Sequence, residues 1–216
     1  MFTLYEELLL LCIHEGKGTF IGTSADQLKT GLGGAILIEL ALLGKIQTSD
    51  NHRLKLVDDS KTNSDILNGA LTALKESEKE RKFGYWFNIL SQRKEKFRKQ
   101  IVESLVQKGV ITQEDDHLQW VIPSPLQVEF KASTKYWVIN RLRRVVLASE
   151  DIESRDIILL SLLRACGLLD LVFLRDERKL ASRTINQLFY SQALKDPVSQ
   201  TIQEIESAVA ELVEED

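Results

Sequence analysis

Residues 32–43 form a strongly apolar stretch in which Glu39 is the single charged residue. A helix of this composition has almost no polar face to turn toward water, so it must be buried on nearly every side. Glycines lie at the two ends of the stretch, at Gly31, Gly33, Gly34 and Gly44. Glycines at such places favour tight turns and close helix packing. The pattern therefore predicts a buried apolar helix at the centre of the fold.

Apolar spacing predicts several further helices. Thr3 precedes a leucine-rich run and Glu6 follows three residues later, which is the capping-box pattern at the start of a helix over residues 3–14. Ser64 is suited to cap a helix that continues to about Lys75. Periodic apolar positions indicate the remaining helices over residues 85–90, 93–108, 134–149, 152–169, 177–192 and 198–213.

Two short segments combine strand-forming residues with a polar turn. Residues 45–48 and 53–57 flank a Ser-Asp-Asn-His turn, and residues 110–112 and 118–122 flank the turn at 113–117. Such pairs predict β-hairpins. The expected fold is therefore mainly α, a single globular helical domain over residues 1–216 with a buried apolar central helix and two small β-hairpins. Its last helix, at about 198–213, is acidic.

Composition narrows the cellular context. No apolar run reaches the roughly 18 residues that a membrane span needs, which argues against a membrane-spanning segment. The first seven residues contain two acids where a secretion signal has bases, so we expect no export. Cys12 and Cys166 both stand in apolar helical contexts and are expected to be reduced thiols in the core of a cytoplasmic protein.

The sequence shows no residue pattern typical of a catalytic site. His14, His52 and His117 are widely separated and lack metal-ligand spacing or a nucleophile partner. The glycines at 31, 33 and 34 lack the lysine and hydroxyl of a phosphate-binding loop and follow no strand. We therefore predict no enzymatic activity, no catalytic residue, no cofactor and no metal site.

A helix followed by a hairpin also suggests a winged helix that binds DNA. The motif Leu40-x-x-x-Gly44-x-Ile46 recurs as Leu105-x-x-x-Gly109-x-Ile111, and each copy precedes a hairpin. A reading helix in the major groove needs basic or amide side chains. Residues 32–43 contain none, so nucleic-acid binding is the third interpretation only.

Net charge is −4, but six acidic residues lie within 203–216, so the rest of the chain is slightly basic. Two basic clusters stand out: Arg93, Lys94, Lys96, Arg98 and Lys99, offset by Glu95, and later Arg141, Arg143 and Arg144. They fit either a solvated helix face or an anionic membrane surface, to which each base would contribute on the order of 1 kcal/mol. Candidates for an apolar contribution to membrane or oligomer contact are Trp120, Val121 and Ile122 in the second hairpin, and Phe20 and Ile21.

Four segments carry a resemblance to a known family. They are residues 4–8 (Leu-Tyr-Glu-Glu-Leu), 31–46, 86–91 (Trp-Phe-Asn-Ile-Leu-Ser) and 105–112 (Leu-Val-Gln-Lys-Gly-Val-Ile-Thr). In order and spacing they resemble the Golgi phosphoprotein 3 family of peripheral membrane adaptors. The resemblance implies a compact, mainly helical domain that binds phosphatidylinositol 4-phosphate. It also implies self-association through the hairpin at 110–122, membrane-protein clients and, in eukaryotes, a place on the cytosolic face of the Golgi.

The resemblance also suggests a headgroup site. Arg98 matches the second of two arginines that the family places three residues apart, and Glu95 stands at the first. Ser24 stands where the family has a tryptophan, and Gly33 where it has an arginine. These departures indicate a divergent family member, of the kind expected in an organism without a Golgi. The candidate lipid headgroup residues are Arg98, the nearby bases Arg93, Lys94 and Lys96, and positions Ser24 and Gly33.

Together, these observations predict a non-enzymatic peripheral membrane adaptor that binds acidic phospholipid headgroups and forms homo-oligomers. The alternative is a helical protein–protein interaction or regulatory module without lipid binding.

Overall fold

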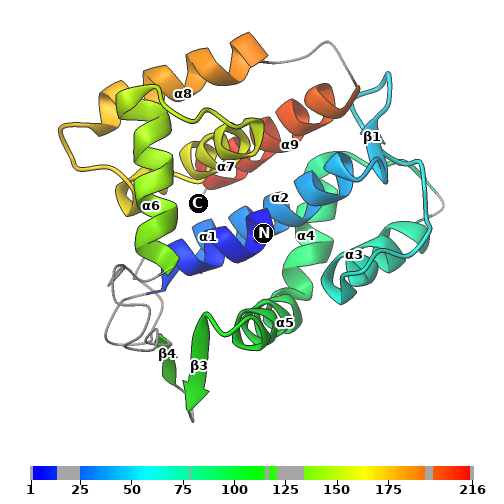
Figure 1. Ribbon diagram of the computed structural model, residues 1–216. Helices are drawn as coiled ribbons and strands as arrows, with labels where there is room; N and C mark the ends of the chain where they lie inside the picture. Colours follow the sequence, from blue (N-terminus) through cyan, green and yellow to red (C-terminus); the bar gives the residue numbers. More distant parts are fainter. Residues whose placement is uncertain are drawn as a thin grey trace.

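Helix α2 (Ala25–Leu42) lies at the centre of the molecule, and its residues 31–41 are all buried. In the computed structural model, which describes residues 2–13, 25–77, 79–114, 117–120, 134–192 and 197–214, the other helices surround it (Figure 1). Helix α1 (Leu4–Cys12) packs beside α2, and all nine of its residues are buried. The predicted buried central helix is confirmed, with a second fully buried helix next to it.

The start of α1 follows the predicted capping box. The Thr3 side chain accepts a hydrogen bond from the Glu6 backbone N–H at 3.4 Å, and the Thr3 N–H donates to the Glu6 carboxylate at 2.8 Å. These bonds satisfy two backbone donors that a helix start otherwise leaves unpaired. Glu6 is nevertheless almost fully buried, so its charge must also be compensated by other elements.

The glycines of α2 permit close packing. A Cβ atom at Gly31 would lie 2.9 Å from the Cys166 Sγ, and one at Gly34 would lie 2.9 Å from the Val209 Cγ2. Both distances are too short for a side chain, so glycine lets neighbouring elements approach the α2 backbone. This confirms the interpretation of these glycines as packing residues. Cys12 and Cys166 are buried free thiols, as expected.

Both predicted hairpins are present. Strands β1 (Ile46–Thr48) and β2 (Leu54–Leu56) pair antiparallel, as do β3 (Ile111–Glu114) and β4 (His117–Trp120). Gly44 and Gly109, at φ of 68° and 67°, each end the preceding helix in the left-handed region. The N–H after each glycine donates back to Leu40 O or Leu105 O, which closes the same helix end. The repeated motif is thus a shared helix stop.

The remaining helices cover the two sides of the α1–α2 pair. Helices α3 (Asp65–Lys75), α4 (Phe83–Gln92) and α5 (Lys94–Gln107) lie on one side, and α6 (Thr134–Arg143), its π-helical continuation η2 (Arg144–Ala148), and α8 (Arg178–Gln192) on the other (Figure 1). Helix α7 (Ser154–Ala165), the short 3-10 turn η3 (Leu169–Leu171) and α9 (Pro197–Glu214) complete the chain. Helix α9, the predicted acidic helix, packs along α2 and α7 with Ile202, Ile205 and Val209 buried. The fold is the mainly α single domain that the sequence predicts.

Candidate functional site

The basic residues predicted to bind a headgroup gather at the start of α5. Arg93 precedes the helix; it donates to the Gly69 carbonyl at 3.2 Å and lies 3.6 Å from the Glu76 carboxylate. Lys96 is exposed and Arg98 is half-buried, while Phe97 between them is buried in the core. Lys94 is the first residue of α5. Arg93 is therefore partly committed to α3, whereas Lys96 is exposed to solvent.

The position of these bases works against the helix itself. The N-terminus of a helix carries a partial positive charge, so cations in the first turn destabilise it by about 0.3–1 kcal/mol each. Helix α5 nevertheless begins Lys-Glu-Lys-Phe-Arg-Lys, and Arg93 provides no side-chain hydrogen bond to cap it. An anion bound at this end would relieve the repulsion. A phosphate group is one anion that helix N-termini bind.

The second basic cluster is paired with acidic side chains of the same protein. Arg141 lies 2.9 Å from Glu7 and 2.8 Å from Asp156, and Arg143 lies 2.6 Å from Glu177. Arg144 pairs with Glu150 and Asp151. Because these charges are already compensated, the second cluster offers little attraction to a membrane. Of the two interpretations left open for this cluster, its pairing with acidic side chains favours a helix face without a membrane role.

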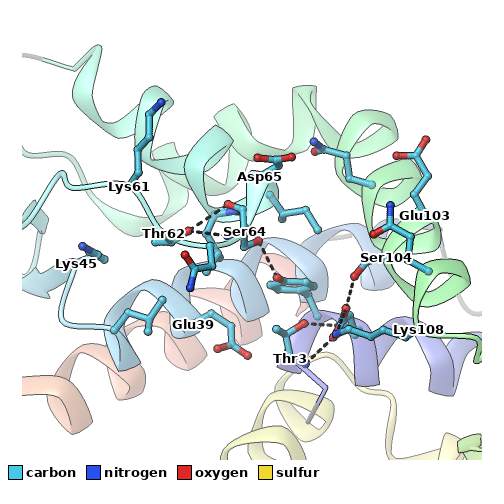
Figure 2. A pocket seen from close by; sticks show the side chains of 18 residues that line it. Thr3, Glu39, Lys45, Lys61, Thr62, Ser64, Asp65, Glu103, Ser104 and Lys108 are labelled. Atoms are coloured by element: carbon cyan, nitrogen blue, oxygen red, sulfur yellow. Dashed lines mark hydrogen bonds and ion pairs between the residues drawn. The ribbon is translucent and has the colours of Figure 1, made fainter.

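A cavity of about 750 Å³ opens between α1, α3 and α5, and Figure 2 shows the side chains that line it. Its floor is a hydrogen-bonded network: the Tyr5 hydroxyl lies 3.1 Å from the Ser64 hydroxyl, and Glu6 accepts from Ser104 and Lys108, each at 2.7 Å. Burial alone would raise the pKa of Glu6, but the bonds from Lys108, Thr3 and Ser104 outweigh it and hold that pKa below its ordinary value.

Most charges around this cavity are paired within the protein. Glu39 accepts from the Leu4 N–H at 2.6 Å and pairs with Arg155, and Lys45 lies 2.6 Å from Asp58. Lys61 and Asp65 at the rim are exposed and make no ion pair among the described residues (Figure 2). No local sequence pattern indicates this cavity, because its walls come from four separate segments of the chain. The capping patterns at Thr3 and Ser64 were the available signal.

Residues 4–205 match the family model described as Golgi phosphoprotein 3. The chain belongs to the Golgi phosphoprotein 3 family. Among curated proteins, it is 33% identical over 132 residues to Vacuolar protein sorting-associated protein 74 of Eremothecium gossypii. That alignment covers 52% of this chain and 39% of the relative, so the chain spans well under half of that protein's length. The predicted family membership is confirmed.

In this Golgi phosphoprotein 3 family member, Gly33, one of the positions that depart from the family pattern, lies on a different helix from the bases of α5. Gly33 is buried, and a Cβ there would lie 3.2 Å from the Phe87 Cδ1 of α4. Position 33 therefore faces the α2–α4 contact, whereas Lys96 and Arg98 lie on α5. Ser24, Val121 and Ile122 lie outside the described residues, and Trp120 ends β4 opposite Ile111.

Two other kinds of feature are absent from the residues that the structure describes. No helix in the described part of this Golgi phosphoprotein 3 family member is both long and apolar enough to cross a membrane. Within the same residues, no group of three or more His, Cys, Asp and Glu side chains is placed to hold a metal ion. His52 lies 2.5 Å from Glu204 of α9, which gives it a structural partner.

Proposed function

We propose that this protein is a non-enzymatic adaptor that attaches peripherally to membranes rich in acidic phospholipid headgroups. The family resemblance makes phosphatidylinositol 4-phosphate the first headgroup to test, and the cytosolic face of the Golgi the expected place if the source is eukaryotic. The observation that carries the proposal is the cluster of bases at the start of α5, with Lys96 exposed to solvent, in a member of the Golgi phosphoprotein 3 family.

The charge at this end of α5 suits weak, salt-sensitive attachment. Lys96 and Arg98 would each contribute on the order of 1 kcal/mol near an anionic surface, and the effect fades within a Debye length of about 8 Å at physiological salt. A few such charges give transient binding. Several copies held together would bind far more tightly, and self-association through the hairpin at 110–122 would supply those copies. Membrane-protein clients would then be held at the same surface.

Vesicle flotation tests the proposal directly. The protein should float with vesicles containing phosphatidylinositol 4-phosphate or phosphatidylserine at low salt, and less at high salt. Vesicles of phosphatidylcholine alone should not carry it. Arg98→Glu and Lys96→Glu should each weaken binding several-fold, because each replaces an attractive charge by a repulsive one.

Lys179→Glu provides a matched control, since Lys179 is exposed on α8 and the charge change is the same. It should bind like the unaltered protein. Absence of binding to anionic vesicles at low salt would refute the proposal and favour a protein–protein interaction module without lipid binding. Equal losses in Arg98→Glu and Lys179→Glu would place the lipid site elsewhere. Salt-sensitive retention on DNA without vesicle binding would favour the third interpretation.

A further inference from the structure

The cavity of about 750 Å³ between α1, α3 and α5 lies apart from the basic start of α5, because the α5 residues that line it begin at Gln100. Its volume is within the roughly 300–1,000 Å³ of small-molecule sites. Helix α2 adds Glu39 to the wall, and the segment after α2 adds Leu43 and Lys45. Glu39 is 6% exposed and Lys45 is 8% exposed. The wall therefore contains two charged side chains that are almost completely buried.

Both of these side chains keep one hydrogen-bonding position free. Glu39 Oε1 accepts from the Leu4 N–H and pairs with Arg155, whereas Oε2 accepts no hydrogen bond in the described part of the chain. The Glu39 side chain keeps 8% of its surface accessible where it lines the cavity, and Figure 2 shows its carboxylate without a bond to any other lining residue. The Lys45 Nζ donates two hydrogen bonds, each of 2.6 Å, and an ammonium group has three donors. One acceptor and one donor thus remain for a ligand.

The charges of the cavity are balanced within the protein. The three buried charges of the wall, Glu6, Glu39 and Lys45, each have an ion-pair partner of opposite sign. The exposed charges at the rim balance as well: they are Asp65, Glu103, Lys61 and Lys99, the partner of Glu103. A charged ligand would lose hydration here without meeting an unpaired charge of opposite sign. The cavity therefore favours an uncharged ligand.

Uncharged polar groups and one apolar side chain complete the wall. Thr62 and Ser64 have hydroxyl groups, and Asn63 and Gln107 have exposed amides. Hydroxyls and primary amides both donate and accept hydrogen bonds. Leu43 is 52% exposed and gives the wall an apolar surface. A sugar has the matching chemistry, because its hydroxyls donate and accept while the C–H groups of its ring are apolar.

We propose that this cavity binds a small neutral sugar of one or two rings. One sugar hydroxyl donates to Glu39 Oε2 and another accepts from Lys45 Nζ. Asn63 and Gln107 bind further hydroxyls, and the C–H face of the ring packs on Leu43. The site is independent of the basic start of α5 and of the proposed lipid binding.

NMR titration of the ¹⁵N-labelled protein tests the site, with glucose, galactose, mannose and maltose as probes. At least one of them should shift the backbone amide resonances of Ser64 and Ser104 saturably, while those of Lys96 and Arg98 stay in place. Protonated glucosamine and glucuronate have the same ring with a charge added. Both should bind several-fold more weakly than glucose, because the charges of the cavity are already paired.

Variants separate recognition from a folding defect. Glu39→Gln keeps one oxygen for the Leu4 N–H and replaces the free acceptor by a donor, so sugar binding should weaken on the order of tenfold. Asn63→Ala and Gln107→Ala remove exposed amides and should each weaken binding by roughly two- to fivefold. Asn186→Ala is the matched control, because Asn186 is an exposed amide on α8, and it should bind like the unaltered protein. These surface variants decide the outcome if Glu39→Gln fails to fold.

Three results would overturn the proposal. The first is the absence of a saturable shift with all four sugars, which would leave only water in the cavity. The second is binding of glucosamine or glucuronate as tight as that of glucose. The third is sugar binding in both Asn63→Ala and Gln107→Ala that equals binding in Asn186→Ala.

Discussion

Removal of the buried carboxylate of Glu39 from α2 should destabilise this protein strongly. Glu39 is 6% exposed, and its Oε1 accepts from the Leu4 N–H at 2.6 Å and from Arg155 of α7. One side chain therefore joins α2 to the start of α1 and to α7. Glu39→Ala leaves the buried Leu4 N–H without an acceptor and Arg155 without its carboxylate.

The magnitude follows from these two interactions. A hydrogen bond from a buried N–H to a charged group is worth about 1.5–3 kcal/mol. The Arg155 pair adds less, because the Arg155 side chain is 25% exposed and also donates to the Phe2 carbonyl at 3.4 Å. Partly exposed ion pairs contribute up to about 1 kcal/mol. Glu39→Ala should thus lower the free energy of unfolding by about 2–4 kcal/mol.

Urea unfolding followed by circular dichroism measures this loss, with the slope m unchanged if the folded and unfolded states keep their compactness. Glu103→Ala serves as the control, because Glu103 is half-exposed, lies 3.9 Å from Lys99 and should change stability by less than about 0.5 kcal/mol. Combining Glu39→Ala with Arg155→Met should cost less than the sum of the two single changes. A Glu39→Ala loss no larger than that of Glu103→Ala would refute the reasoning.

Three further predictions concern buried groups. Burial raises the pKa of Glu206 from 4.5 to about 8, so between these pH values the folded protein keeps a proton that the unfolded chain releases. The free energy of unfolding should therefore fall as pH rises from 4.5 to about 8. Glu206→Gln should remove the contribution of this residue to that fall, as measured by urea unfolding at several pH values. An unaltered slope in Glu206→Gln would contradict the assignment. Gly34→Ala should cost about 1–3 kcal/mol in thermal unfolding, because its Cβ would meet Val209, and Val209→Ala should recover part of the loss. Burial raises the pKa of Cys12 to about 12 and that of Cys166 further, so iodoacetamide should label both thiols only after unfolding, and labelling of the native protein at neutral pH would contradict their burial.

The basic start of α5 is a feature that local sequence patterns can predict. The sequence alone located Arg93, Lys96 and Arg98 and predicted the helix that carries them, because helix periodicity and charge spacing are properties of neighbouring residues. The same reasoning treated Arg141, Arg143 and Arg144 as an equivalent cluster. Glu7, a partner of Arg141, lies 134 residues away, and Glu177, the partner of Arg143, lies 34 residues away. No local pattern could indicate that these two arginines were already neutralised.

The presence of the helices, the capping box at Thr3, both hairpins and the burial of residues 31–41 were determined by the sequence itself, because each depends on residues within a few positions of one another. Helix ends were less well determined, since the central helix begins at Ala25 and not at residue 32. The tertiary structure alone decided which polar groups meet. Glu39, for example, accepts a hydrogen bond from the Leu4 N–H and forms an ion pair with Arg155. It also decided where cavities remain, including the one between α1, α3 and α5 that Tyr5, Ser64 and Ser104 line. Such features depend on distances between segments that the fold brings together, and those distances leave no periodic trace along the chain.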